Sequence, residues 1–396
     1  GDGGEDGGAD PGDPVGAGCR VVGGDGSRVV VCHDRHSMEA MTQLTRPTPL
    51  TATGADPDFI EHLSAPDPAD LPKGHPVDAM AGHDKLSPRE QLNLLLQYFA
   101  DSYPEIFTSL TTDEGAGITV TPELKDATER MWARVPDLIT HCSLLVLGAG
   151  LDHAMPGVAF LRTGPAADPV EVAGLHGTVL RPSGPTGAVA VSLHGGPGWF
   201  GDAESHEQLW LPLFAALAEK SGVTVVDLIY PLPGYGDGTP AATETAVAAA
   251  FAEVRSRSGE FVGDRTGEDS VEGAVATASA DRVGLVTFGS GLTVAEQVLE
   301  QASFLLAMTP RIPEGFSPDL SQVPTRVSVA SEDSRGTAAQ VVLDWFGTHA
   351  GVSGKVTAPA AGSGFEYAEY LSEHIIGVPE VWRRRVADDA AWLAAR

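Results

Sequence analysis

Apolar residues change their spacing along the chain, and this change predicts the architecture. From about residue 157, short continuous apolar runs alternate with longer amphipathic stretches. Short uninterrupted runs are typical of strands buried on both faces of a parallel sheet. We predict strands at 188–193, 223–229, 283–288, 304–308 and 326–330. We predict helices at 206–220, 239–257, 293–302, 336–350 and 378–395. Strands that alternate with helices predict an α/β fold, with a mostly parallel central sheet flanked by helices.

Two further strands are expected where this pattern begins. Residues 158–162 and 170–180 contain valine and leucine at strand-like spacing, and we predict that they form an antiparallel pair. The main domain is therefore expected to span 156–396.

Helices are expected to precede this domain. Ser87-Pro88-Arg89-Glu90 has the pattern of a capping box with proline at the first helical position. A second helix is predicted over 122–141, with Met131 and Trp132 among its apolar residues. Residues 86–155 should thus form an N-terminal helical cap or extension over the main domain.

The first 85 residues differ in composition from the rest. Residues 1–14 are almost entirely Gly, Asp, Glu, Ala and Pro, which cannot bury enough apolar surface to offset the entropy of ordering. We expect a disordered tail over 1–40, with a loose hairpin around 20–31, and an irregular arm over 41–85. Because the composition changes near Met38 and Met41, we take one of them as the hypothetical biological start. The tail would then lie outside the native protein.

Charge narrows the possible partners. The chain has 54 acidic and 25 basic residues, a net charge of −29, and 42% hydrophobic residues. Such a charge repels nucleic acid and anionic membranes, so we expect neither as a partner. No apolar run is long enough to span a membrane, no secretory signal opens the chain, and there are three cysteines. These features favour a cytoplasmic protein, and the Ala-, Gly- and Asp-rich composition suggests a bacterial source.

No metal or cofactor is expected. Cys19, Cys32, His33 and His36 lie near one another in the tail, but their spacing matches no standard zinc pattern.

A glycine-rich loop, His194-Gly195-Gly196-Pro197-Gly198, directly follows the strand predicted at 188–193. Such a loop can bring backbone N–H groups to a developing oxyanion, because no side chain blocks the approach. The alternative is a glycine turn that leads into a helix.

Several motifs in order resemble one enzyme family. Asp227-Leu-Ile-Tyr230 ends a strand, Pro240-Ala-Ala begins a helix, and Arg282-Val-Gly-Leu-Val-Thr-Phe-Gly-Ser-Gly follows. With the glycine-rich loop, they resemble the hormone-sensitive-lipase-like carboxylesterase branch of the α/β-hydrolases. The resemblance covers roughly residues 175–396. It implies an α/β-hydrolase fold and the hydrolysis of small acyl esters.

The resemblance also implies the remaining catalytic residues. Asp333, which follows the strand at 326–330, matches the acid of the triad, with Glu332 as the alternative. His374 lies where the family has its histidine. The order nucleophile, acid, histidine is the one that α/β-hydrolases use. The alternatives are an acidic loop and a half-buried structural histidine.

The nucleophile position departs from the family. Residues 287–291 read Thr-Phe-Gly-Ser-Gly, where Gly-x-Ser-x-Gly is expected. The apex of this turn has positive φ and needs small residues two positions before and after it. Gly289 as apex has Thr287 and Gly291 at these positions, whereas Ser290 would have Phe288 and Leu292. The sterics therefore predict Gly289 at the apex.

Three functions remain open for these residues. In an ester hydrolase, Ser290 would be the nucleophile, His374 the base and Asp333 the acid, with Gly195, Gly196 and Gly291 binding the oxyanion. In a pseudo-hydrolase, the same pocket would bind a small ligand or a protein partner without turnover. A purely structural scaffold is a third alternative. Family members commonly form dimers, so a homodimer is compatible with either function.

Overall fold

A computed structural model describes residues 19–22, 29–32, 86–110, 119–147, 165–262, 282–349 and 364–396. The chain divides into two compact units, residues 1–84 and 85–396. In the first unit, β1 (Cys19–Val22) pairs antiparallel with β2 (Val29–Cys32), where we predicted a loose hairpin. The other predictions for the tail and arm lie outside the described residues, as do those for 148–155.

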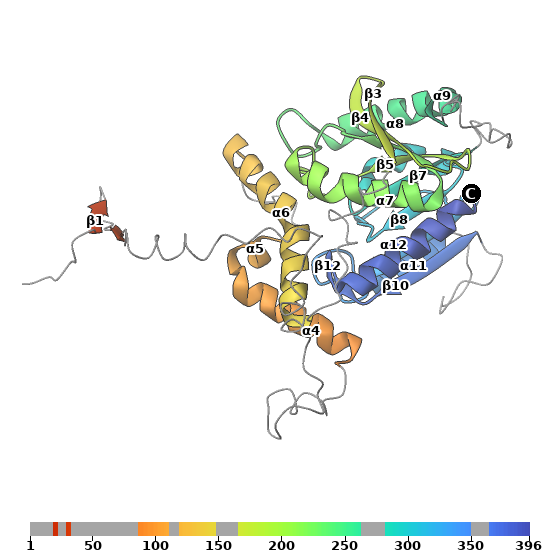
Figure 1. The fold of residues 1–396 in the computed structure, drawn as a ribbon. Coiled ribbons are helices and arrows are strands. Elements are labelled where there is room, and N and C mark those ends of the chain that lie inside the picture. Colours follow the sequence, from red (N-terminus) through yellow and green to blue (C-terminus); the bar gives the residue numbers. More distant parts are fainter. Residues whose placement is uncertain are drawn as a thin grey trace, which may run out of the picture. The chain divides into compact units, whose positions relative to one another are not determined.

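An eight-stranded sheet forms the centre of the second unit (Figure 1). Its strands lie in the order β10-β9-β8-β7-β5-β6-β4-β3, and all neighbours are parallel except β3 with β4 and β4 with β6. The strands are β3 (Ala166–Val172), β4 (Leu175–Arg181), β5 (Val189–Leu193), β6 (Thr224–Leu228), β7 (Val283–Phe288), β8 (Leu305–Met308), β9 (Thr325–Ala330) and β10 (Phe365–Tyr370). This strand order, with an antiparallel second strand, is that of the α/β-hydrolase fold, and it confirms the predicted fold class.

One predicted strand was wrong in its bounds, one strand of the sheet was not predicted, and the strand expected at 158–162 lies outside the described residues. The antiparallel pair lies within 166–181: β3 and β4 are joined at Ala173 and Gly174, both with positive φ. Because the turn falls inside the segment taken as one strand, 170–180 contains parts of both. The edge strand β10 was not predicted, because its sequence Phe-Glu-Tyr-Ala-Glu-Tyr lacks the continuous apolar run of a buried strand.

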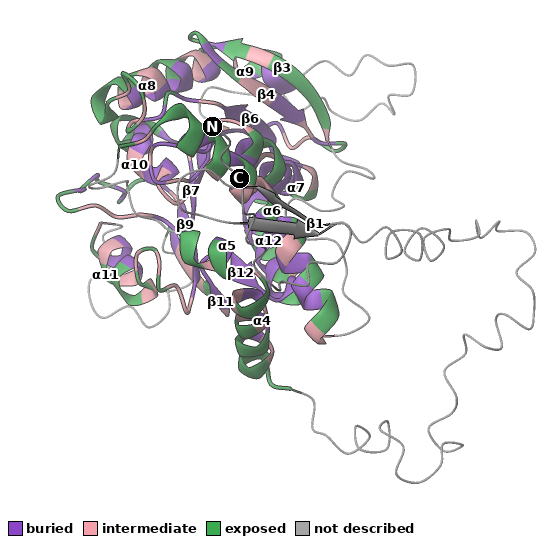
Figure 2. Cartoon of the chain, turned by 90° about the vertical axis from the view of Figure 1, so that its left-hand side faces the viewer, coloured by how far each residue is buried: buried purple, intermediate pink, exposed green. Residues whose placement is uncertain are grey.

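Helices cover both faces of the sheet. α7 (Leu211–Ser221) and α12 (Pro379–Ala394) pack on one face. α8 (Pro240–Ser256), α9 (Ser258–Val262) and α11 (Ala339–His349) pack on the other. Figure 2 shows the central strands buried between these layers. The helix predicted at 293–302 is instead a short α10 (Gly291–Val294) followed by a 3-10 segment, Glu296–Gln301.

Among the residues that the structure describes, three helices precede the sheet: α4 (Pro88–Ser102), α5 (Pro104–Ser109) and α6 (Pro122–Leu147). The capping box at α4 is present, since Ser87 and Glu90 exchange side-chain and backbone hydrogen bonds. Apolar residues of all three helices join the cluster that includes α7 and α12. α4 packs against β12 (Ile376–Gly377), which pairs with β11 (Ser372–Glu373). None of the helices described has the length and hydrophobicity that a membrane span needs.

Candidate active site

The turn between β7 and α10 holds the position of the expected nucleophile. β7 ends at Phe288, and Gly289 then adopts φ 53°, in the left-handed region. Ser290 follows with φ −70° and ψ −12°, which is right-handed helical geometry at the start of α10. Gly289 is therefore the residue at the apex of the turn, and Ser290 lies beyond it.

The space around this turn agrees with that placement. A β-carbon at Gly291 would collide with the Leu193 carbonyl oxygen and would lie 2.8 Å from that of His194. The second position after the apex must therefore be glycine. At Gly289 itself a β-carbon would meet only Gly195 Cα, at 3.5 Å, which is an ordinary van der Waals contact. Backbone conformation, rather than lack of space, makes glycine favourable at this position.

Ser290 is hydrogen-bonded within the glycine-rich loop. Its Oγ donates to the Gly196 carbonyl oxygen at 2.5 Å. Gly196 has φ 129°, and the peptide that follows it has no N–H because the next residue is Pro197. In the ester-hydrolase interpretation, Ser290 would instead have to donate to His374. Gly291 was expected to bind the oxyanion because it follows Ser290. With Gly289 at the apex, the residue that follows the apex is Ser290, so its backbone N–H would take that role.

The predicted acid and base are brought together from segments 41 residues apart. His374 Nδ1 lies 3.1 Å from Asp333 Oδ2. The other oxygen, Oδ1, accepts the backbone N–H groups of Arg335 and Gly336. Burial raises the pKa of Asp333, but the hydrogen bond and charge of His374, together with these N–H groups, outweigh it and hold the pKa below its usual value. Glu332, the alternative acid, pairs with Arg89 at 2.8 Å instead.

The histidine is held in an uncommon conformation. His374 has φ 50° and is 8% exposed, between the two short strands β11 and β12. The preceding Glu373 accepts hydrogen bonds from Ser334 Oγ at 2.8 Å and from Arg335 Nε at 3.1 Å. The loop that carries Asp333 therefore holds the side chain of the residue before the histidine as well as the histidine ring.

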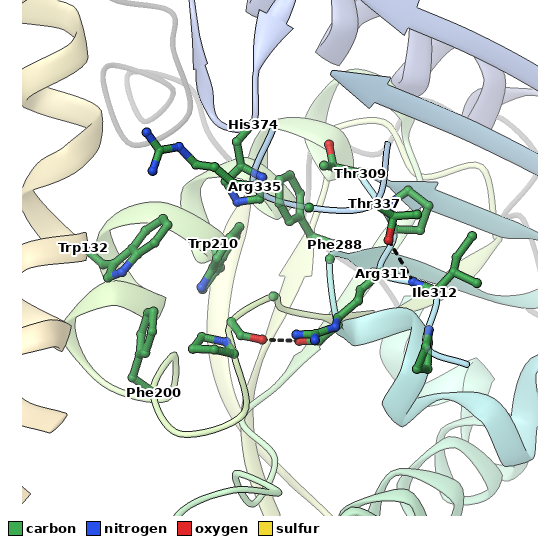
Figure 3. Close-up of a pocket in the computed structure, with 18 residues that line it drawn as sticks. Trp132, Phe200, Trp210, Phe288, Thr309, Arg311, Ile312, Arg335, Thr337 and His374 are labelled. Atoms are coloured by element: carbon green, nitrogen blue, oxygen red, sulfur yellow. Dashed lines mark hydrogen bonds between the residues drawn. The ribbon is translucent and has the colours of Figure 1, made fainter. Parts of the chain in front are cut away.

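A cavity of about 270 Å³ opens beside this dyad. One wall is aromatic, and Figure 3 shows Trp132, Phe200 and Trp210 on it. Residues 309–313, which follow β8, and residues 335–337 also line the cavity, and Figure 3 shows Arg311, Ile312 and Thr337 across from the aromatic wall. Gly195, Gly196, Gly289, Ser290 and His374 all line the same cavity. The arrangement brings the predicted loop, turn and histidine together around a space for a small molecule.

Sequence reasoning missed several lining residues. Trp132 was assigned only to the apolar side of a helix, yet α6 carries it to the cavity. Arg311 belongs to the segment that follows the carboxyl end of β8. Ligands in open α/β sheets bind at the carboxyl ends of strands, and this rule was the available signal.

Buried polar groups hold the base of the glycine-rich loop. His194 stacks on Tyr230 with ring centroids 4.2 Å apart, and Tyr230 Oη donates to the His194 carbonyl at 2.6 Å. Burial, and then the charge of His206, lower the pKa of His194 to about 4. His206 Nε2 lies 2.9 Å from Asp227, whose other oxygen accepts from Ser192. His194 is therefore neutral and structural near neutral pH.

The segment that follows the glycine-rich loop is held by α6. Glu129 of α6 is fully buried, and its carboxylate accepts the N–H groups of Gly201, Asp202 and Ser205 at 2.7, 3.2 and 3.0 Å. Lys125 lies 3.5 Å from the same carboxylate. Burial opposes ionisation, but these hydrogen bonds and the charge of Lys125 hold the pKa of Glu129 below its usual value. No pattern in the sequence indicated this contact.

In the part of the chain that the structure describes, no group of three or more His, Cys, Asp or Glu side chains is arranged to hold a metal ion.

Comparison with solved structures finds similar folds among esterases. A hormone-sensitive lipase from a metagenome library is 16% identical, with a TM-score of 0.47, over 79% of this chain and all of that chain. An ester hydrolase from the metagenome of Lake Arreo is 16% identical, with a TM-score of 0.49, over 78% of this chain and 99% of that chain. An esterase from the archaeon Pyrobaculum calidifontis is 13% identical, with a TM-score of 0.49, over 79% of this chain and 99% of that chain. No protein-family model matches the sequence, and no curated protein matches it.

Proposed function

We propose that this α/β-hydrolase-fold protein binds a small acyl ester or carboxylic acid in the cavity beside His374 without forming an acyl-enzyme. One observation carries the proposal: the apex of the turn is Gly289, and the neighbouring Ser290 hydroxyl donates to Gly196. A serine nucleophile needs a base within hydrogen-bond reach. Here the Ser290 hydroxyl donates its hydrogen bond to a backbone carbonyl and not to a base.

The cavity suits a small ligand with an apolar body. Its aromatic wall offers apolar contact area, and Arg311 lies among the lining residues across from it (Figure 3). Ligand sites commonly combine apolar walls with a few polar groups that fix orientation. A short aromatic acid or its ester has an apolar body and an oxygen-bearing end that match the two sides.

Covalent labelling tests the first part of the proposal. The protein would be incubated with a fluorophosphonate probe and its intact mass measured. We expect no adduct, and the same mass as a His374→Ala protein treated in parallel. An adduct mapped to Ser290 would establish the serine-hydrolase alternative.

Tryptophan fluorescence tests the second part, because Trp132 and Trp210 line the cavity. Titration with phenylacetate should change the emission in a saturable way. Trp132→Ala removes part of the apolar wall and should weaken binding roughly tenfold, which corresponds to about 1.4 kcal/mol. Leu94→Ala, at an exposed position of α4, is the matched control and should leave the affinity unchanged. Absence of saturation would refute a ligand site for small acids.

A further inference from the structure

The acid–base pair remains fully assembled although the apex carries no nucleophile. His374 is a non-glycine residue with positive φ, a conformation that persists only where the surroundings over-determine it. The Glu373 side chain, next to the histidine, accepts hydrogen bonds from Ser334 and Arg335. The Asp333 carboxylate, which contacts the histidine ring, accepts two backbone N–H groups. A strained His374–Asp333 pair that is held by several hydrogen bonds beside a cavity indicates that the His374 imidazole functions as a base.

The hydrogen bonding fixes which nitrogen can act. The pKa of Asp333 is held below its usual value, so its carboxylate is ionised near neutral pH and accepts a hydrogen bond. His374 Nδ1 faces that carboxylate and must carry the proton. In the neutral ring, Nε2 then has the free lone pair of a general base. His374 lines the cavity, so a molecule bound in the cavity would lie beside this base.

Glycine at the apex leaves room for a different nucleophile. A β-carbon at Gly289 would approach nothing closer than Gly195 Cα at 3.5 Å. Gly289, Gly195 and His374 all line the cavity, so the space of a serine hydroxymethyl group is open to it. That space is about the size of a water molecule.

We propose that the protein hydrolyses small activated esters in a single displacement, with water as the nucleophile and His374 as its base. This rests on the proposed function, in which no acyl-enzyme forms. The water oxygen bonds to the acyl carbon while its proton passes to Nε2. The tetrahedral intermediate collapses, the bond from carbon to the leaving oxygen breaks, and that oxygen takes the proton from Nε2. The products are a carboxylic acid and an alcohol.

The cavity indicates the substrate class. The aromatic wall of Trp132, Phe200 and Trp210 and a volume of about 270 Å³ fit a short aromatic or branched group. Phenolic esters such as 4-nitrophenyl acetate combine a small acyl part with a leaving group that needs little assistance. General-base catalysis contributes about 10²- to 10⁴-fold.

The test is the hydrolysis of 4-nitrophenyl acetate by the full chain, in steady state and in the first turnover. We expect linear release of 4-nitrophenol without a burst, and no acetylated protein in acid-quenched samples. His374→Gln should lower kcat/KM about 100-fold or more, and Asp333→Asn about tenfold or more, because it allows the wrong tautomer. His176→Ala, which removes an exposed imidazole on β4, should leave the rate unchanged.

Three results would overturn the inference, and they differ in what else they refute. A wild-type rate equal to that of His374→Gln, with phenylacetate still bound, would refute turnover and leave the ligand site standing. An equal loss of rate in His176→Ala would show non-specific imidazole catalysis. A burst with acetyl on Ser290 would refute both the water mechanism and the proposed function. Circular dichroism and the melting temperature of each variant show whether a lost rate reflects lost folding. If His374→Gln fails to fold, the Asp333→Asn rate decides.

Discussion

Restoring a nucleophile at the apex is the sharpest perturbation that the structure offers. Gly289→Ser would place a hydroxymethyl group at the turn between β7 and α10, in the cavity that His374 also lines. If the apex is correctly assigned, this hydroxyl completes a triad with His374 and Asp333. The variant should then gain covalent serine chemistry that the wild type lacks.

Two magnitudes follow from the local geometry. The nearest atom to a new β-carbon is Gly195 Cα at 3.5 Å, so packing adds little cost. The φ of 53° lies in the left-handed region, where a side chain costs about 1–2 kcal/mol, and the variant should lose that much stability. Removing the serine from a working triad costs about 10⁶-fold in kcat. Even in imperfect geometry, the restored serine should raise 4-nitrophenyl acetate turnover by about 100-fold.

Gly289→Ala is the matched control, since it carries the same backbone strain without a hydroxyl. Both variants should show the same loss of stability in urea unfolding. Only Gly289→Ser should react with a fluorophosphonate probe, show a burst of 4-nitrophenol and depend on His374 for both.

A Gly289→Ser protein that folds like Gly289→Ala but is neither labelled nor active would refute the assignment of the apex. It would mean that a hydroxyl at position 289 does not reach His374. Labelling at Ser290 in either variant would point to the same error.

Three further predictions concern the groups that hold the site. Gly291→Ala should cost about 2 kcal/mol or more, because its β-carbon collides with the Leu193 carbonyl. Glu129→Ala should cost about 3–5 kcal/mol, because it removes a buried carboxylate that accepts three N–H groups, and Glu129→Gln should cost less. The pKa of buried His194 falls from 6.5 to about 4, so it contributes stability that is present above pH 6.5 and lost as the pH falls to about 4. In His194→Gln, the free energy of unfolding should fall by about 3 kcal/mol less than in the wild type over this pH range.

Urea unfolding measures all three, the last at several pH values between 4 and 7. Unchanged stability in Gly291→Ala would show that the turn can move away from Leu193. Equal losses for Glu129→Ala and Glu129→Gln would mean that the charge, rather than hydrogen bonding, holds the loop. A pH slope in His194→Gln as steep as that of the wild type would assign the acid loss to other groups.

The sequence predicted the fold where the pattern was local. Buried strands such as 283–288 carry uninterrupted apolar runs, and Thr239-Pro240 marks a helix start, with the Thr239 side chain accepting the Ala242 N–H. Prediction failed where pairing decides the structure. β10 is an edge strand that alternates glutamate with aromatic and small residues, and only its parallel register with β9 makes it a strand. The turn within 166–181 was missed for a similar reason, because both flanks read as strand.

The sequence by itself determined the α/β architecture, the order of the motifs and the glycine at the apex, because these depend on residue type and spacing along the chain. Tertiary structure alone decided which groups meet. It placed Asp333, rather than Glu332, against His374, and it directed the Ser290 hydroxyl to Gly196. Contacts between residues so far apart in the chain depend on the packing of whole elements, and no local pattern encodes them. The open question of the serine motif thus became a geometric one, and the structure gives the apex to Gly289.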